Sequence, residues 1–279
     1  MSNLISIATA MYCDPWLIEP SMHKVLCTIV ENHIKGGEAE KAQRLLGMSF
    51  DEQKEEKVEP YQVIDGIAVI PLYGVIGRRV GRLERSSGVT DVDVFSRAIV
   101  RAMGDPMVQK IMIDVDSPGG TVGGVQNAAD TVRKASEVKK TMAFTGGTMA
   151  SAAYWIASGA SVIYADETSS VGSIGVYTMI LDSTRYLDNL GLKQQVFSSG
   201  KYKAAGADGT SLTDEQKAQI QSRVDDLFAI FKDEVRRYNP AIADDTMQGQ
   251  VFLGAKSVDA GLVNSVASFS KALEDLRNW

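Results

Sequence analysis

Apolar and polar residues follow one another along this chain in blocks that predict strands alternating with helices. Short apolar runs rich in β-branched residues predict buried strands over residues 66–70, 110–116, 141–144 and 161–165. Apolar positions at helical spacing predict helices between them: one that Asp91 caps and Asp105 ends, one over 121–138 and one over 152–158. Alternating β and α elements indicate an α/β fold with a parallel sheet and right-handed crossovers.

The regions outside this alternation receive their own predictions. Residues 1–59 are expected to form a separate N-terminal arm, with a helix capped by Ser21, a second helix over 38–46 and a charged linker. Residues 60–279 are expected to form one domain. Within it the pattern predicts a loop over 74–89, a strand over 192–197 and a long helix over 213–238. The apolar stripe of that helix is Leu227, Ile230, Phe231 and Val235.

Two glycine-containing turns follow neighbouring predicted strands. Residues 117–120 read Ser-Pro-Gly-Gly, and Gly146 and Gly147 precede Ser151, where a strand hands over to a helix. In a parallel sheet both turns lie at the carboxyl edge, where such sheets place their sites. Glycine N–H groups there can face a substrate oxygen, and a serine at a helix N-terminus is well placed as a nucleophile. The alternative is a glycine turn followed by an N-capping serine.

Composition narrows the classes of function. The net charge of −6 argues against nucleic acid as the main partner. Cys13 and Cys27 match no metal-ligand spacing and are expected to be reduced thiols. The sequence has no apolar run long enough to span a bilayer and no recognisable signal peptide, so a soluble, cytoplasmic protein is expected. Motifs for a P-loop, a dinucleotide or zinc are missing, so neither a cofactor nor a metal is predicted.

Four motifs occur in a fixed order: residues 116–120 (Asp-Ser-Pro-Gly-Gly), 149–154 (Met-Ala-Ser-Ala-Ala-Tyr), 170–176 (Ser-Val-Gly-Ser-Ile-Gly-Val) and 199–203 (Ser-Gly-Lys-Tyr-Lys). Together they resemble the signal peptide peptidase A family of serine peptidases, which use a Ser–Lys dyad. The likeness extends from about residue 65 to the C-terminus and implies the Clp/crotonase-like α/β fold of repeated ββα and βα units. Residues 14–20 resemble the start of phage head-maturation proteases, a branch of that family; the alternative is a packing arm without a role in chemistry.

A serine nucleophile needs a base that removes its proton. The only two histidines, His23 and His33, lie in the predicted arm, so a Ser-His-Asp triad is not expected and a lysine must be the base. By the resemblance, Ser151 is the nucleophile and Lys203 the general base, with Lys201 a solvated neighbour. A lysine acts as a base only when neutral, and burial favours that state. The alternative is that both lysines are solvated on a loop.

The resemblance also implies roles around this dyad. The hydroxyl of Ser173 is expected to orient the lysine amine, because a neutral amine needs acceptors for its own N–H groups; the alternative is an ordinary turn serine. The backbone N–H groups of Gly120 and Ala152 are predicted to form the oxyanion hole, with Gly119 shaping the turn. An extended substrate is expected to pair its backbone near Gly119 and Gly172.

These expectations add up to an ATP- and metal-independent endopeptidase, a phage or prophage head-maturation protease acting on scaffold or capsid proteins. Portal protein is a further possible partner. Family members with tandem repeats place the lysine and the serine on different repeats, whereas this chain carries Ser151 and Lys203 in one. A homo-oligomeric ring with the dyad shared between neighbouring chains is therefore predicted. The alternatives are a cellular cytosolic peptidase that degrades signal peptides or other peptides, and a structural head protein that does not use its dyad.

Overall fold

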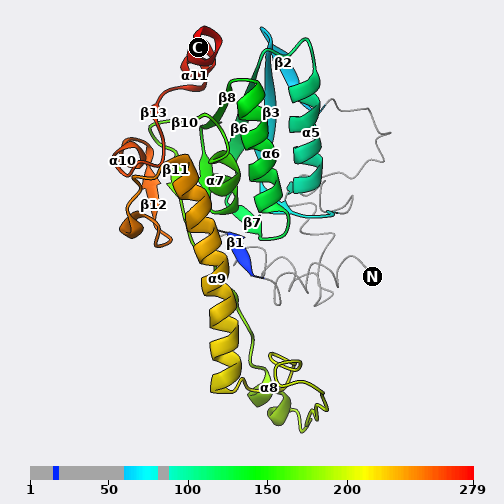
Figure 1. The fold of residues 1–279 in the computed structure, drawn as a ribbon. Coiled ribbons are helices and arrows are strands. Elements are labelled where there is room, and N and C mark those ends of the chain that lie inside the picture. Colours follow the sequence, from blue (N-terminus) through cyan, green and yellow to red (C-terminus); the bar gives the residue numbers. More distant parts are fainter. Residues whose placement is uncertain (1–14, 19–59, 81–87) are drawn as a thin grey trace, which may run out of the picture.

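Three sheets and the helices packed on them make up the part of the chain that the structure describes, residues 15–18, 60–80 and 88–279 (Figure 1). The structure is a computed structural model. The two helices predicted in the N-terminal arm lie outside the described residues, and so does nearly all of the charged linker. The division of the chain at residue 60 therefore stays a prediction.

The largest sheet has the strand order β13-β10-β8-β6-β3-β2, and its neighbours run parallel except at β2. Its strands are β2 (Gln62–Ile64), β3 (Ile67–Tyr73), β6 (Lys110–Asp116), β8 (Thr141–Thr145), β10 (Val162–Ala165) and β13 (Ser265–Val266). One face packs on helices α5 (Val92–Gly104) and α6 (Val125–Val138), and the other on α11 (Phe269–Asn278). Because both faces are covered, the strands read as continuous apolar runs.

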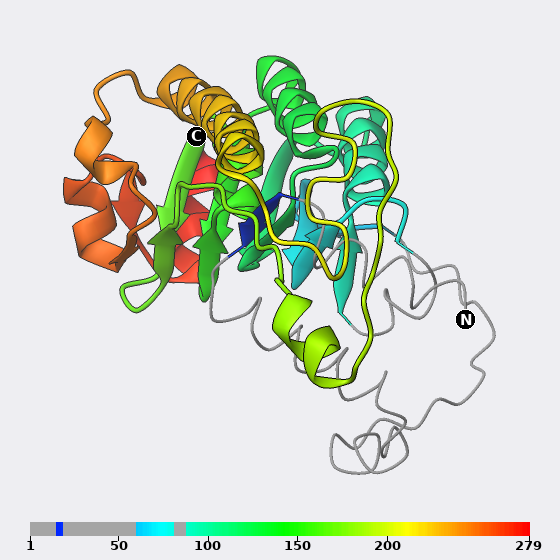
Figure 2. The same ribbon diagram turned by 90° about the horizontal axis from the view of Figure 1, so that it is seen from below.

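Short strands form a second layer, made of a four-stranded and a three-stranded sheet, on the side of the molecule that Figure 2 shows. The long strands β3, β6, β8 and β10 are each followed by one short strand: β4 (Val75–Gly77), β7 (Gly119–Thr121), β9 (Thr148–Ala150) and β11 (Ser170–Gly172). The remaining members are β1 (Trp16–Ile18), β5 (Val89–Asp91) and β12 (Val251–Leu253). In two consecutive units a helix follows the short strand, α6 after β7 and α7 (Ala152–Ala157) after β9. The predicted α/β fold of repeated ββα units with a parallel sheet is confirmed.

Helix ends follow their capping residues. The Asp91 carboxylate accepts hydrogen bonds from the N–H groups of Asp93 and Val94 and starts α5 as predicted. Helix α9 (Asp214–Tyr238) begins at a capping box between Thr213 and Gln216. Helix α6 begins four residues later than predicted, because residues 119–121 belong to β7.

Two other predictions are wrong. The predicted loop over 74–89 contains β4 and ends in β5, strands too short to show a two-residue period. Residues 192–197 form no strand; they are exposed, and Phe197 is 91% accessible. Branched and aromatic residues favour a strand only where a partner strand is present to pair with. These residues belong to a segment that projects from the core, here named the extension (residues 178–213). The extension contains α8 (Thr184–Asn189), and the outer half of α9 projects with it (Figure 1).

The inner half of α9 is fixed to the core by stacking and by a buried carboxylate. Trp155 of α7 stacks on Phe231 with ring centroids 4.7 Å apart. Glu234, only 2% exposed, accepts hydrogen bonds from Arg133 of α6 and from Arg237, both at 2.8 Å. Ile230, expected in the apolar stripe, is 41% exposed. The helix is therefore held from Phe231 to its end, while its beginning stands away from the core.

Replacing Glu234 with alanine should lower the free energy of unfolding by about 2 kcal/mol. Breaking a buried ion pair costs roughly 3–5 kcal/mol, but the Arg133 side chain is 28% exposed and can turn to water. Urea denaturation measures the change. The control is Glu274→Ala, which removes an exposed pair with Lys271 and should change stability by less than about 0.5 kcal/mol. Equal losses in the two variants would mean that Glu234 does not hold α9 in place.

Candidate active site

Ser151 occupies a strained turn between β9 and α7. Its backbone angles are φ 54° and ψ −117°, a conformation that costs a residue with a Cβ about 1–3 kcal/mol. Its N–H donates to the carbonyl of Gly172 at 2.8 Å. The side chain makes no capping hydrogen bond to α7, so the N-capping alternative is wrong. The residue is 1% exposed.

The turn after β6 lies directly against the Ser151 turn, as predicted. The N–H of Ser117 donates to Thr148 at 2.7 Å, and its carbonyl accepts from the N–H of Ala150 at 3.1 Å. Gly119 has φ +100°, and its N–H donates to the Ser117 hydroxyl at 3.2 Å. A Cβ placed on Gly119 would stand 3.0 Å from the Cβ of Ser151. Gly119 therefore shapes a turn that brings the two motifs together.

Ser173 follows the strand that holds the Ser151 backbone. Strand β11 runs parallel to β9 with Gly172 opposite Ala150, which sets Ser173 beside the Ser151 turn. Ser173 also has a positive φ of 52° and is 6% exposed, and its N–H donates to the carbonyl of Gln250 at 2.7 Å. Gly172 is paired on both sides, with β9 and with β12. It therefore offers a substrate no open strand edge.

The two predicted oxyanion donors lie on either side of Ser151. Ala152 is the first residue of α7, so its N–H has no acceptor within the helix. Gly120 lies in β7, in register with Ile76 of β4 on one side and Leu17 of β1 on the other. A Cβ on Gly120 would come within 1.9 Å of the Ile76 carbonyl oxygen, so only glycine fits this position. The roles of both N–H groups stay predictions.

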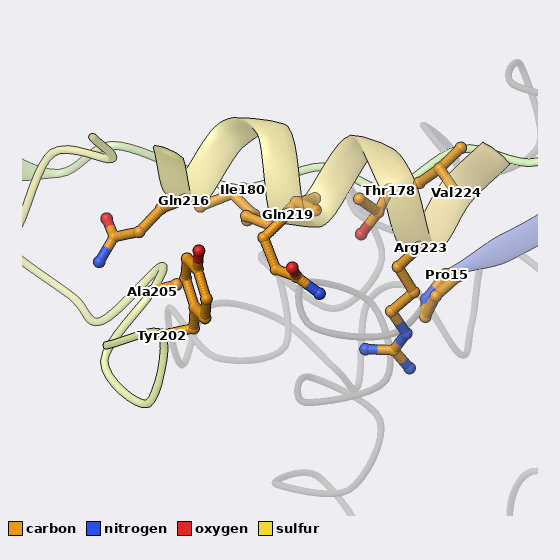
Figure 3. Close-up of a pocket in the computed structure, with 10 residues that line it drawn as sticks. Pro15, Thr178, Ile180, Tyr202, Ala205, Gln216, Gln219, Arg223 and Val224 are labelled. Atoms are coloured by element: carbon orange, nitrogen blue, oxygen red, sulfur yellow. The ribbon is translucent and has the colours of Figure 1, made fainter. Parts of the chain in front are cut away.

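Lys203 lies far from Ser151 within one chain. The neighbouring Tyr202 lines a pocket with Gln216 and Gln219, near the start of α9 (Figure 3). Helix α7, in contrast, contacts α9 at Phe231. Phe231 lies about 18 Å beyond Gln219 along the axis of α9, at 1.5 Å per residue. Lys203 itself is exposed on the extension. One chain therefore brings Ser151, Ser173 and the glycine turn together and leaves the lysine apart from them.

Lys201 is engaged elsewhere. Its ammonium lies 2.9 Å from the carboxylate of Glu215, and this hydrogen bond raises the pKa of Lys201. A base needs the opposite direction, so Lys201 fits its predicted role as a solvated neighbour. Among the described residues, no cluster of three or more His, Cys, Asp or Glu side chains is placed to hold a metal ion. In the same residues, no helix combines the length and the apolar character that crossing a membrane requires.

The family model for peptidase family S49 matches residues 133–278, a range that includes Ser151, Ser173 and Lys203. The chain therefore belongs to peptidase family S49, the family of the signal peptide peptidase A-like peptidases. This finding confirms the resemblance that the four sequence motifs indicate.

Its relatives include proteins of phages. The chain is 28% identical to capsid assembly protease C of Escherichia phage lambda, over 100% of this chain and 66% of that protein. It is 29% identical to the head-tail preconnector protein GP5 of Enterobacteria phage P21, over 97% of this chain and 56% of that one. The chain thus spans less than two thirds of the length of both. A crystal structure of an enoyl-CoA hydratase/isomerase family member covers 78% of this chain and 74% of its own, with a TM-score of 0.45 and 15% identity.

Two features of the site are not predicted from the sequence: the role of the Ser117 hydroxyl and the position of β1. The Ser117 hydroxyl, fully buried, fixes the Gly119 turn, yet the motif alone assigns it no function. Strand β1 lies beside Gly119 and Gly120, although more than a hundred residues separate them in the chain. Residues 14–20 do stand out in the sequence as a short motif, but the motif does not predict which strand β1 pairs with.

Proposed function

We propose that this chain is a Ser–Lys endopeptidase that cleaves scaffold or other capsid assembly proteins during phage head maturation. The backbone of Ser151 carries the proposal: a buried residue other than glycine held at positive φ, at the start of a helix. Such strain persists where the surroundings enforce it and clusters at functional sites. Membership of family S49 supports the peptidase class, and the names of the two phage relatives support the role in assembly.

The proposed chemistry combines the groups around Ser151 with a lysine that has to be brought to them. The neutral amine of Lys203 takes the proton of the Ser151 hydroxyl, and the Ser151 oxygen attacks the carbonyl carbon of the scissile bond. The N–H groups of Gly120 and Ala152 stabilise the negative oxygen that forms. The lysine then protonates the leaving amine, and a water molecule deprotonated by the same lysine releases the acyl group. Ser173 accepts a hydrogen bond from the amine and orients it.

The separation of Lys203 from Ser151 favours a base supplied by a second copy of the chain. Head-to-tail contacts between copies close into a ring when the rotation allows it. The extension that carries Lys203 also exposes large apolar side chains: Leu181, Tyr186, Leu190, Leu192 and Phe197. A surface of this kind is typical of a protein contact. A free chain would lack Lys203 beside its serine, so proteolysis would begin only on assembly.

A mixing experiment tests the shared site. Ser151→Ala and Lys203→Ala chains should each be inactive, because each lacks one half of the dyad. Assembled together in equal amounts, they should recover about a quarter of the parental activity, since random neighbours pair an intact serine with an intact lysine at that frequency. Peptide hydrolysis measures recovery, and native mass spectrometry establishes that mixed oligomers form.

The control mixes Ser151→Ala with the double variant Ser151→Ala/Lys203→Ala, a pair that holds no intact serine. It should stay inactive at every ratio. Mixed oligomers of the two single variants that form and yet hydrolyse nothing would show that the dyad, if it exists, is built within one chain.

A further inference from the structure

Strand β1 is held between two other segments of the chain. Trp16, Leu17 and Ile18 run antiparallel to β7 and lie opposite Thr121, Gly120 and Gly119, respectively. On its other side, the N–H of Trp16 donates to the carbonyl of Tyr177 at 2.8 Å, and the N–H of Tyr177 donates back at 3.2 Å. The three residues therefore fill a groove between β7 and Tyr177 as its middle strand.

The backbone of Leu17 faces the glycine turn. Successive residues of a strand direct their N–H and C=O groups to opposite sides, and Trp16 uses its own towards Tyr177. Leu17 consequently directs its groups towards β7. A Cβ built on Gly119 would lie 2.1 Å from the Leu17 carbonyl oxygen and 3.0 Å from the Cβ of Ser151. A peptide carbonyl of this chain thus lies beside Gly119, next to the proposed nucleophile.

Within the described residues, β1 covers the edge of β7 that faces it. Trp16, Leu17 and Ile18 are 4%, 0% and 2% exposed, and Ser151 is 1% exposed. The opposite edge of β7 pairs with β4. A second extended peptide has no free edge of β7 on which to pair while β1 is present.

We propose that Trp16–Ile18 is a built-in blocking strand that occupies the place of the substrate's strand beside Gly119 and Gly120. This inference rests on the proposed peptidase function. It also indicates the ligand: the groove takes an extended peptide with consecutive large apolar side chains, because Trp, Leu and Ile fill it and are buried there. Main-chain pairing supplies the affinity, and the side chains supply the preference.

The groove continues beyond the N-terminal end of β1. Pro15 lines a cavity of about 270 Å³ together with residues of the extension and of α9 (Figure 3). Gln216, Gln219 and Arg223 contribute polar groups to its wall, and Tyr202 lines it from the extension. A peptide longer than three residues therefore meets polar side chains here, after the apolar part of the groove.

A binding measurement on inactive protein tests the blocking strand apart from catalysis. The probe is a fluorescent peptide with the sequence of residues 14–20, Asp-Pro-Trp-Leu-Ile-Glu-Pro, added to full-length chains that carry Ser151→Ala. Adding Leu17→Asp places a carboxylate in a fully buried position and should release β1. Anisotropy should then show at least tenfold tighter peptide binding than in Ser151→Ala alone.

The matched control adds Val63→Asp, on the exposed side of edge strand β2, to Ser151→Ala. It should bind the peptide as Ser151→Ala alone does. Unchanged binding in a folded Leu17→Asp chain overturns the proposal and leaves β1 a permanent strand of the fold.

A reversible lock covers the case in which Leu17→Asp fails to fold. Trp16 and Thr121 face each other as a non-hydrogen-bonded pair, a spacing suited to a disulfide. Trp16→Cys/Thr121→Cys, with Cys13 and Cys27 replaced by serine, fixes β1 when oxidised. The oxidised chain should bind the peptide at least tenfold more weakly than the same chain after reduction. Equal binding in the oxidised and the reduced chain overturns the proposal, and so does a lack of binding in both. Released chains that bind peptide but hydrolyse none when Ser151 is intact would keep the blocking strand and remove the Ser–Lys peptidase.

Discussion

The Ser151→Ala variant is expected to lose peptide hydrolysis by a factor on the order of 10⁴–10⁶, the loss that removal of a serine nucleophile causes in serine peptidases. The fold should survive the change. The Ser151 hydroxyl makes no capping bond, and its deletion adds no charge or bulk, so the free energy of unfolding should change by less than about 1 kcal/mol. Hydrolysis and thermal unfolding of the same preparation separate the two effects.

Ser158 provides the matched control, because it is a second buried serine, at the other end of α7. Its hydroxyl donates to the carbonyl of Trp155 at 2.7 Å, away from the glycine turn. Ser158→Ala should keep its activity and its labelling by a fluorophosphonate, while Ser151→Ala should lose both. Labelling that persists in Ser151→Ala would place the nucleophile elsewhere.

Co-expression with a candidate scaffold protein extends the test to the substrate. Mass spectrometry should find cleaved scaffold with the parent and intact scaffold with Ser151→Ala.

The elements that sequence analysis predicts well are those with a long, unbroken pattern. Strand β8 and the first halves of β3 and β6 are buried or partly buried on both faces and so read as apolar runs, and α9 carries both a capping box and a helical stripe. The second layer is harder to predict, because its strands of three residues are too short to show a period. The extension misleads for another reason: Leu192, Val196 and Phe197 have strand-favouring side chains but no strand beside them.

In the site, too, some features can be predicted from the sequence and others cannot. The motifs place Ser151, Gly119 and Gly120 at neighbouring strand ends, and the parallel register of β6 and β8 brings them together. Sequence cannot supply the positive φ of Ser151 or Ser173, because that strain arises from contacts with Gly172 and Gln250 across the sheet. The pairing of β1 with β7 likewise depends on residues distant in the chain, and pairing of that kind leaves no local signal.

Exchange of Lys203 for arginine should abolish hydrolysis as completely as exchange for alanine. Arginine keeps the positive charge on a slightly longer side chain, but its guanidinium does not give up a proton at any working pH, so it cannot act as a base. Both variants should therefore lose activity by a factor on the order of 10³ or more while still forming oligomers. If Lys203 merely contributed a charge to a contact between chains, arginine would preserve it and Lys203→Arg would stay active.

Lys201→Ala is the matched control, since Lys201 lies two residues away in the same turn of the extension. It removes an exposed pair with Glu215 and should keep most of the activity, because a lysine whose pKa is raised by that carboxylate stays protonated. Initial rates of peptide hydrolysis, measured on oligomers of matched size, compare the three variants. An inactive Lys201→Ala beside an active Lys203→Ala would assign the base to Lys201. Full activity in both alanine variants would exclude a lysine of this turn from the mechanism, because neither amine would then be needed to take the proton of Ser151.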